Sequence, residues 1–332
     1  MALSLSARLE STCAGWSRAG AKRAPALEGE RLVALPSATV RVVRAGRGPR
    51  VLVLVPDPPN VIEHHLEVMR DLARDHTVYA FEMVGFGHSR PHPGFAHDLA
   101  AHCRVLHELF AELELEHVTL SVACLSGLAG ATFATLEPER VARLVLLQVP
   151  SVEEARRWAG RTDRFHLIRT PVAGQLFTWA ARRTILRHWY RVSLPEPFDA
   201  QRYHALLEPS EHALDAGAGF ALASGYQSLS GARARFPPET PQLHVWGTAD
   251  RTHAQTRRRA ALDGLAAAEY VECPGVGHFP DLEQPNRYTE LVRAFESRHG
   301  RERGVSGRPN CSGAQEGGGA QNDDHGVEFF RP

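Results

Sequence analysis

Residues 118–130 read VTLSVACLSGLAG, a run in which a strand-like segment leads directly into a helix-forming one. Residues 118–123 combine apolar and β-branched side chains, which favours a buried strand. Residues 126–136 favour a helix, and Cys124 stands at the junction. A cysteine at this position faces the positive end of the helix dipole, so the sequence predicts a lowered thiol pKa.

On both sides of this run, strand-like and helix-like segments alternate along the chain. Strands are predicted at residues 31–35, 39–44, 51–55, 77–83, 143–149, 242–246 and 269–273, and helices at 61–73, 99–115, 255–267 and 286–298. Such alternation is typical of parallel sheets with right-handed helical crossovers. The sequence therefore predicts an α/β fold, with a doubly wound, mostly parallel sheet of about eight strands.

The alternation stops after Pro150 and resumes near Pro241, with mostly helical segments and no convincing strand between them. This interruption predicts a helical cap inserted into the sheet domain. The C-terminal residues are rich in Gly, Ser, Asn, Asp and Gln, which is typical of disorder. The predicted division is a partly ordered extension (1–30), a core (31–150 and 236–299), a cap (151–235) and a disordered tail (300–332).

Charge and composition exclude several classes of protein. The chain of 332 residues carries 38 basic and 38 acidic residues, so no electrostatic footprint for nucleic acid is expected. Its 43% hydrophobic content lies in the ordinary globular range. No apolar run is long enough to span a membrane, and the first thirty residues show no secretory signal.

The cysteines give no sign of a disulfide framework or a zinc site. They are odd in number, widely spaced and without a C-x-x-C pair: Cys13, Cys103, Cys124, Cys273 and Cys311. This usage favours a reducing compartment, and we expect a cytoplasmic protein. His64 and His65 resemble a metal cluster only superficially, because adjacent helical residues face different ways. We interpret them as a solvated helix start, from which His64 or Glu63 could still reach a pocket.

Three predicted strands end at residues that together can support nucleophilic chemistry. Cys124 follows residues 118–123, Asp250 follows the strand at 242–246, and His278 follows the strand at 269–273. Open α/β sheets bind ligands beyond the carboxyl ends of their strands. A thiol nucleophile needs a base within hydrogen-bond reach, and the base needs a carboxylate to fix its tautomer. The order nucleophile, acid, histidine is that of α/β-hydrolase triads.

Several motifs together resemble the α/β-hydrolase superfamily over residues 31–299. They are VLVLVPDPPN (51–60), FEMVGFGHSRP (81–91), LSVACLSGLAG (120–130), EPERVARLVLL (137–147), WGTAD (246–250) and GVGHFPDLEQP (275–285). The resemblance implies a nucleophile elbow at Cys124, an acid at Asp250 and a catalytic base at His278. It implies no metal and no cofactor.

The elbow departs from the family pattern at Val122, where a small residue is expected two positions before the nucleophile. Ser126 is the alternative nucleophile, in a frame that puts Leu128 where a small residue belongs. The constant length of the following helix favours Cys124.

The loop that supplies an oxyanion donor departs further. Relatives usually have His-Gly-x-Pro, whereas this chain has Pro56-Asp57-Pro58-Pro59, and Pro58 has no N–H to donate. Loss of one such donor typically costs about 10²–10³ in rate. The Asn60 side chain, the backbone amide of Asp57 or Asn60, or a cap residue would have to substitute, beside the surviving amide of Leu125.

These features predict an enzyme that cleaves or transfers the acyl group of an ester or thioester. Aromatic residues interleaved with arginines over residues 176–191 predict a cap helix above the site, which favours a small to mid-sized apolar substrate. A second hypothesis is a non-hydrolytic relative that binds a small ligand or a partner, and Val122 and Pro58 motivate it. The sequence does not predict the oligomeric state.

Overall fold

The computed structural model describes residues 4–19, 21 and 26–300 of the chain. Contacts separate a compact unit of residues 1–299 from residues 300–332. The predicted disordered tail, which includes Cys311, lies outside the described residues apart from Gly300. Helix α1 (Leu5–Arg18) occupies much of the predicted N-terminal extension, and the Ser4 hydroxyl caps it by accepting the N–H of Ala7.

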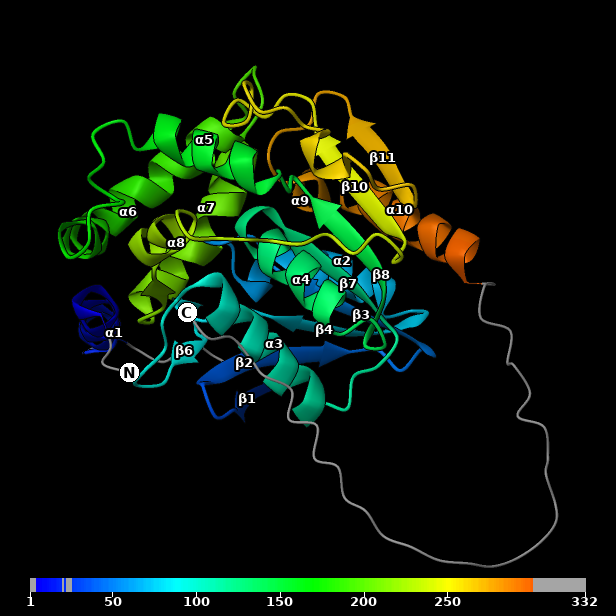
Figure 1. Cartoon of the computed structure of the whole chain (residues 1–332), viewed down its shortest axis with the longest axis horizontal. Coiled ribbons are helices and arrows are strands. Elements are labelled where there is room, and N and C mark those ends of the chain that lie inside the picture. Colours follow the sequence, from blue (N-terminus) through cyan, green and yellow to red (C-terminus); the bar gives the residue numbers. More distant parts are fainter. Residues whose placement is uncertain (1–3, 20, 22–25, 301–332) are drawn as a thin grey trace, which may run out of the picture. The chain divides into compact units, whose positions relative to one another are not determined.

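A mixed sheet forms the centre of the unit, and its order confirms the predicted doubly wound topology (Figure 1). The eight consecutive strands run in the order β1-β2-β4-β3-β7-β8-β10-β11, and β6 pairs with β2. Neighbours from β4 to β11 are parallel, whereas β1, β2 and β6 join by antiparallel pairing. The strands are β1 (Glu30–Ala34), β2 (Ala38–Ala45), β3 (Arg50–Val55), β4 (His76–Phe81), β6 (Arg90–Pro91), β7 (Val118–Ala123), β8 (Val141–Leu147), β10 (Gln242–Gly247) and β11 (Ala268–Cys273).

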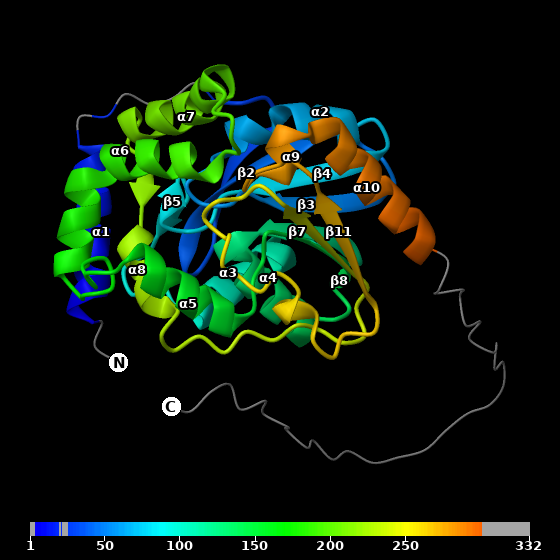
Figure 2. The same ribbon diagram turned by 90° about the horizontal axis from the view of Figure 1, so that it is seen from above.

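Helices cover both faces of this sheet, because its central strands are apolar on both sides. One face packs on α3 (Leu99–Glu112) and α4 (Cys124–Leu136), which contribute Phe110 and Phe133 to the larger core cluster. The other face packs on α2 (Leu66–Leu72) and α10 (Pro285–His299). Figure 2 shows these two helical layers with the sheet between them. The 3₁₀ helix η1 (Ile62–His65) precedes α2, and α9 (Pro280–Glu283) precedes α10.

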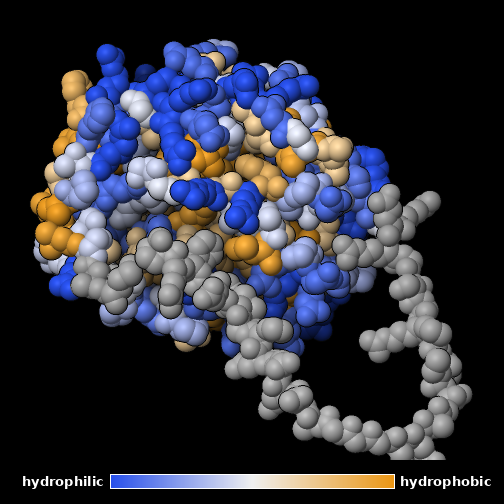
Figure 3. Space-filling view, in the orientation of Figure 1, coloured by the Kyte–Doolittle hydropathy of each residue, from blue (hydrophilic) through white to orange (hydrophobic). Residues whose placement is uncertain are grey.

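The segment between β8 and β10 is mostly helical, as the sequence predicts. It contains α5 (Val152–Thr162), α6 (Ala173–Ser193), α7 (Ala200–Asp215) and α8 (Leu222–Ser228). The exception is the two-residue strand β9 (Gly219–Phe220), which pairs with β5 (Phe86–Gly87) of the preceding half. Figure 3 shows apolar surface near the left edge of the view, toward α6, which exposes Leu176 and Phe177.

The predicted helix at residues 255–267 is wrong. Turns and the short 3₁₀ helix η2 (Ala260–Leu262) occupy the segment. The three consecutive arginines of this segment have different partners. Arg257 pairs with Asp263, and Arg258 donates to the carbonyl of Thr248. Arg259 lies over the ring of Tyr270. Gly264 then adopts a φ of +84°, which ends any regular helix.

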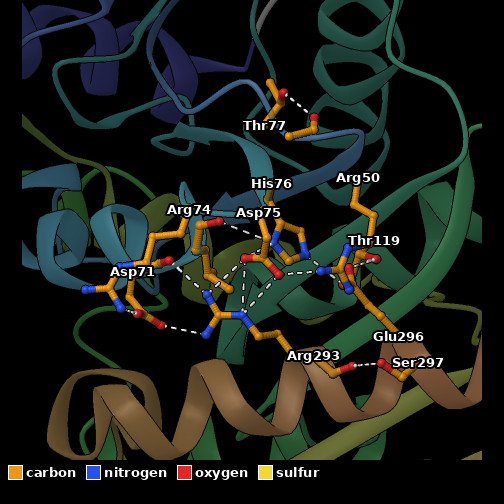
Figure 4. A network of polar contacts seen from close by, with 12 residues as sticks. Arg50, Asp71, Arg74, Asp75, His76, Thr77, Thr119, Arg293, Glu296 and Ser297 are labelled. Carbon is orange, nitrogen blue, oxygen red and sulfur yellow. Dashed lines mark hydrogen bonds and ion pairs between the residues drawn. The ribbon is translucent and has the colours of Figure 1, made fainter.

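A buried polar network joins α10 to the amino ends of the central strands (Figure 4). Glu296 accepts hydrogen bonds from His76 at 2.7 Å and from the Thr119 hydroxyl at 2.6 Å. Arg293 binds Asp71 and Asp75 at the same end. This network lies at the sheet edge opposite to the strand ends that carry Cys124 and His278, so it fixes the fold rather than the site.

Among the described residues, no helix has both the length and the apolar character needed to cross a bilayer.

Candidate functional site

Cys124 lies where strand β7 turns into helix α4. Its backbone φ is +42°, a left-handed value that is uncommon for a residue with a side chain. The turn brings the thiol to the carboxyl edge of the sheet, where Cys124 is partly exposed and lines a cavity. Strained conformations of this kind are concentrated at functional sites. The sequence predicts a nucleophile elbow at this position, and a left-handed residue between a strand and a helix is compatible with that prediction.

The large residue at position 122 fits because α4 has a glycine opposite to it. Val122 is 1% exposed, and a Cβ atom at Gly130 would lie 2.7 Å from its Cγ1 atom. Such a distance is shorter than real contacts allow. Gly127 makes a similar close approach to Val149. The small residues that let the helix approach the sheet are therefore in α4, and they compensate for the bulk of Val122.

Asp250 and His278 form a tight buried pair. The Nδ1–H of His278 donates to Oδ2 of Asp250 at 2.6 Å. The backbone N–H and hydroxyl of Thr252 donate to Oδ1 of Asp250 at 2.8 and 2.7 Å, and Nε2 of Gln148 donates to Oδ2 at 2.7 Å. Burial opposes ionisation, but the charge and hydrogen bond of His278 hold the pKa of Asp250 well below its usual value. The carboxylate is thus ionised and fixed.

A second carboxylate contacts the other nitrogen of the same ring. Oδ2 of Asp57 lies 3.2 Å from Nε2 of His278, and Asp57 is 4% exposed. Burial disfavours the protonated imidazolium form of His278. The charge and hydrogen bond of Asp250, together with the hydrogen bond to Asp57, nevertheless raise the pKa of His278 well above its usual value. The two carboxylates therefore favour a protonated His278. Burial raises the pKa of Asp57 as well, against the opposing effect of His278.

The predicted lowering of the Cys124 pKa is wrong. Burial and then the negative charge of Asp57 raise the pKa of this thiol to about 11, although His278 opposes the shift. The helix dipole at the start of α4 is a modest term that these two effects exceed. The site therefore favours a neutral thiol next to a protonated imidazole. A thiolate forms only when the surroundings of Cys124 change.

The loop after β3 leaves few donors for an oxyanion. Pro58 and Pro59 line the cavity without an N–H. The N–H of Asn60 donates to the carbonyl of Asp57 at 2.7 Å, and its side-chain oxygen accepts the Tyr190 hydroxyl at 2.6 Å. Asn60 is therefore held in the loop rather than directed at Cys124. Leu125 lines the cavity, and its N–H belongs to the first turn of α4, where amides have no intrahelical partner.

Ser126 faces away from the cavity. It is 2% exposed, and its hydroxyl donates to the carbonyl of Ala123 at 2.7 Å while accepting the N–H of the same residue. The hydroxyl thus caps the helix that Cys124 begins. Of the two nucleophile candidates, Cys124 is the one that lies with the Asp250–His278 pair.

His253 is a site residue that the sequence analysis missed. One ring nitrogen of His253, one of His278 and the sulfur of Cys124 all lie within 4.8 Å of one another. The His253 ring stacks on that of His278 with centroids 5.3 Å apart, and on Trp158 at 5.5 Å. Burial lowers the pKa of His253 to about 3, so its ring is neutral. Its place three residues after Asp250, in the same loop, is the signal that could have found it.

Gln148 is a second missed residue. It directly follows β8 and is fully buried, with a φ of +52°. Its Nε2 donates to Asp250 and its Oε1 accepts the N–H of Gly247 at 3.0 Å. The strand predicted at residues 143–149 includes this position, whereas β8 ends at Leu147, so the sequence pattern does not place Gln148 at a strand end.

A cavity of about 960 Å³ opens above Cys124. Its floor includes Asp57, Pro58, Cys124, Leu125 and His253. The segment between β8 and β10 contributes aromatic walls, among them Trp158, Phe177, Trp189, Phe220 and Tyr226. The ring of Trp189 stands edge-on to His278 with centroids 5.0 Å apart. The wall is thus rich in aromatic rings, and its charged or polar residues include Arg161, Asp163 and Arg251 besides Asp57 and His253.

The interpretation of His64 and His65 as a solvated helix start is wrong. His65 is 2% exposed, and its Nε2 bonds Asp281 at 2.9 Å. Nε2 of His64 bonds the carbonyl of Leu206 at 2.7 Å, and Glu63 binds Arg41. None of the three residues lines the cavity. Their partners come from distant parts of the chain, so local helix geometry could not indicate them.

Comparison with known proteins agrees with this architecture. The sequence model of a family described as "alpha/beta hydrolase fold" matches residues 59–285. The uncharacterized protein Rv2715 of Mycobacterium tuberculosis is 25% identical over 267 residues, which cover 76% of each chain.

Two solved structures share the fold at low sequence identity. Epoxide hydrolase A from Mycobacterium thermoresistibile has a TM-score of 0.63 and 19% identity, and the match covers 81% of this chain and 98% of that one. An epoxide hydrolase from Vigna radiata has a TM-score of 0.61 and 17% identity, with coverage of 81% and 97%.

Proposed function

The chain belongs to the α/β-hydrolase fold family, and we propose that it cleaves or transfers the acyl group of an ester or thioester through Cys124. In this proposal Cys124 is the nucleophile, His278 is the base and Asp250 orients His278. The observation that carries it is the position of a thiol at φ +42° beside the 2.6 Å pair of His278 and Asp250.

The chemistry runs in two balanced steps. Sulfur bonds to the carbonyl carbon while the thiol proton passes to His278, and the tetrahedral oxyanion accepts a hydrogen bond from the N–H of Leu125. The C–O or C–S bond to the leaving group then breaks, and His278 returns the proton to that group. Water, or another nucleophile for acyl transfer, attacks the acyl-cysteine, loses its proton through His278 and restores the thiol.

The cavity indicates the class of substrate. Its size of about 960 Å³ is near the upper end of ordinary ligand pockets. Aromatic and aliphatic side chains cover much of its wall, although Arg161, Asp163 and His188 also line it. An apolar acyl or alkoxy group of small to middle size would bury most of its surface there while its carbonyl faces the thiol.

Asp57 imposes a condition on this reaction. Its carboxylate occupies the side of His278 that must accept the thiol proton. A bound substrate would have to separate the two groups, or move the shared proton from His278 to Asp57, before Nε2 can act as a base. Substrate-dependent activation of the thiol is therefore part of the proposal.

A second candidate is a binding protein of this fold without turnover. The N–H and side-chain oxygen of Asn60 are already hydrogen-bonded within the protein, and residues 58 and 59 are prolines. The oxyanion loop is thus left with few donors, which favours a binding protein. Preorganised donors are usually the largest single term in acyl transfer, so their loss could leave a ligand pocket with little activity.

The test compares purified wild-type protein with Cys124→Ala and His278→Ala on p-nitrophenyl esters and acyl thioesters of graded chain length. Cys103→Ala, at a buried cysteine away from the cavity, is the matched control. Each of the first two substitutions should lower kcat by roughly 10⁴-fold or more. An acyl group should appear on the Cys124 peptide by mass spectrometry in a rapidly quenched wild-type reaction.

Other outcomes would contradict the proposal. Turnover that survives Cys124→Ala but not Ser126→Ala would transfer the nucleophile to Ser126. Hydrolysis of an epoxide but of no ester or thioester would change the substrate class. Saturable binding of apolar esters with no turnover, and unchanged by Cys124→Ala, would establish the binding protein instead.

A further inference from the structure

We propose that the sulfur of Cys124 and the ring nitrogens of His253 and His278 form a binding site for a divalent cation such as Zn²⁺. The site goes beyond the proposed acyl chemistry, because it requires only that the three donors converge. It also departs from the sequence-based expectation that the chain has no metal site.

The three donors are close enough to meet on one ion. They lie within 4.8 Å of one another, and they come from three separate strand ends. Around a tetrahedral Zn²⁺, with Zn–S near 2.3 Å and Zn–N near 2.0–2.1 Å, donors are separated by roughly 3.3–3.6 Å. Bringing the three donor atoms to these distances thus requires side-chain shifts on the order of 1 Å, with no rearrangement of the strands.

His253 supplies the independent observation. Its side chain is 1% exposed, and its Nε2 atom has no hydrogen-bond partner among the residues that the structure describes. Its Nδ1 atom is held by the hydroxyl of Thr256 at 3.0 Å. A buried polar atom without a partner is uncommon and requires an explanation, such as an ion or a water. A cation between His253 and Cys124 would satisfy it.

The second histidine has the partner that metal-binding histidines usually have. Nδ1 of His278 donates to Asp250, which fixes the ring and makes Nε2, now in contact with Asp57, the atom that could bind a metal. Ligating histidines almost always donate their other N–H to a carboxylate, a carbonyl or water in this way. Asp250 is in turn held by Thr252 and Gln148, so the outer partners are themselves ordered.

Charge and access also favour a cation. Asp57 and Asp250 place two carboxylates next to the three donors, and Cys124 adds a third negative charge when binding displaces its proton. Metal binding at Nε2 would replace the present contact of His278 with Asp57. Cys124 and His253 face the cavity, so a fourth coordination position stays open to water or an exogenous ligand, as in catalytic rather than structural zinc sites.

Occupancy has a direct consequence for the thiol. The ion would use the electron pairs of both Cys124 and His278, so the thiol could neither attack a carbonyl nor transfer a proton. If the proposed acyl chemistry holds, Zn²⁺ inhibits it reversibly and a chelator restores it. The binding itself is measurable without any substrate, which separates the two proposals.

The test uses the full chain, kept reduced and freed of metal by a chelator. Co²⁺ is added as a spectroscopic probe, and Zn²⁺ is titrated against a chromophoric chelator. We expect one tight ion per chain, with a thiolate-to-Co²⁺ charge-transfer band and intense tetrahedral d–d bands. Cys124→Ser should abolish the charge-transfer band. His253→Gln should weaken Zn²⁺ binding by more than roughly 100-fold, because loss of an outer-shell partner alone costs 10–100-fold.

The controls remove equivalent groups elsewhere. His97→Gln changes another buried histidine whose Nε2 has no partner in the described structure, and Cys103→Ser changes another buried cysteine. Both should bind Zn²⁺ like the wild type, and circular dichroism should be the same for all variants. A Co²⁺ spectrum without the thiolate band, or affinity equal in wild type and His253→Gln, would overturn the site and show adventitious binding. Should His253→Gln fail to fold, Thr256→Val, which frees the ring, must weaken binding at least tenfold.

Discussion

Oδ2 of Asp57 lies 3.2 Å from Nε2 of His278, so the imidazole that should activate Cys124 is held between two carboxylates. A triad needs one carboxylate on Nδ1 and a free Nε2. The second carboxylate therefore stabilises the protonated ring and, by its charge, the neutral thiol. The reactivity of Cys124 therefore depends on Asp57.

Asp57→Asn should accelerate alkylation of Cys124 by iodoacetamide near pH 7.5. The change removes the charge that raises the pKa of the thiol, and each unit of pKa corresponds to about a tenfold change in thiolate. We expect an increase of roughly three- to tenfold, read from the Cys124 peptide by mass spectrometry. Asp71→Asn, far from the cavity, should leave the rate unchanged. A slower reaction in Asp57→Asn would contradict the electrostatic role.

Much of the fold could be predicted because its central strands are short apolar runs between turn residues. The predicted strand at 118–123 coincides with β7, and the strand-end rule selected Cys124, Asp250 and His278, which the structure brings together. Selecting the residues that follow each strand succeeds because the carboxyl ends of all parallel strands lie at one edge of the sheet.

The remaining features depend on contacts between residues far apart in the chain. The helix dipole alone predicts a lowered pKa for Cys124, whereas burial and the charge of Asp57 raise this pKa. His65 has a partner at Asp281 that no local pattern indicates. The segment at 255–267 contains helix-forming residues, yet its arginines bind three different partners. Each failure is a case in which tertiary contacts override a local preference.

Gly130→Ala should destabilise the protein, although alanine is the better helix former. The new Cβ atom would lie 2.7 Å from Cγ1 of Val122, and overpacking of a rigid core costs about 1–3 kcal/mol. Gly160→Ala in α5 is the matched control, because nothing lies within 4 Å of its Cβ position. That variant should gain about 0.5–1 kcal/mol from helix propensity, measured by urea unfolding.

Val122→Ala in the Gly130→Ala background should recover part of the loss. The two changes share one contact, so we expect a coupling free energy of at least about 1 kcal/mol. Additive effects would show that α4 can move away from β7 without cost. In that case the glycine does not compensate for Val122 at the elbow.

Gln148→Leu should lower kcat on any acyl substrate by roughly 10–100-fold with little change in KM. The amide holds Asp250 and the N–H of Gly247, and its loss lets the carboxylate that orients His278 shift. A misplacement of 1 Å in an orienting group can cost about 100-fold. Gln175→Leu, at a buried glutamine in α6, controls for lost stability and should keep kcat. Equal losses in both variants would exclude a positioning role.

Docking of α1 should weaken as the pH rises from 6 to 8. Glu10 is 5% exposed and accepts the Ser224 hydroxyl at 2.7 Å, and burial raises its pKa from 4.5 to about 7 in spite of that bond. The docked helix therefore favours the protonated acid. Its contribution is complete below pH 4.5 and is lost as the pH passes through 7, which amounts to about 1 kcal/mol between pH 6 and 8.

Hydrogen exchange of the α1 amides, corrected for the intrinsic pH dependence, measures this change directly. Protection should fall severalfold between pH 6 and 8 in the wild type. Glu10→Gln keeps an acceptor for Ser224 but cannot ionise, so its protection should be independent of pH over this range. Glu28→Gln, at an exposed position, should behave like the wild type. Glu10 is the one acidic residue of α1. If Glu10→Gln retained the wild-type pH dependence, a titratable group outside α1 would have to cause the loss of protection.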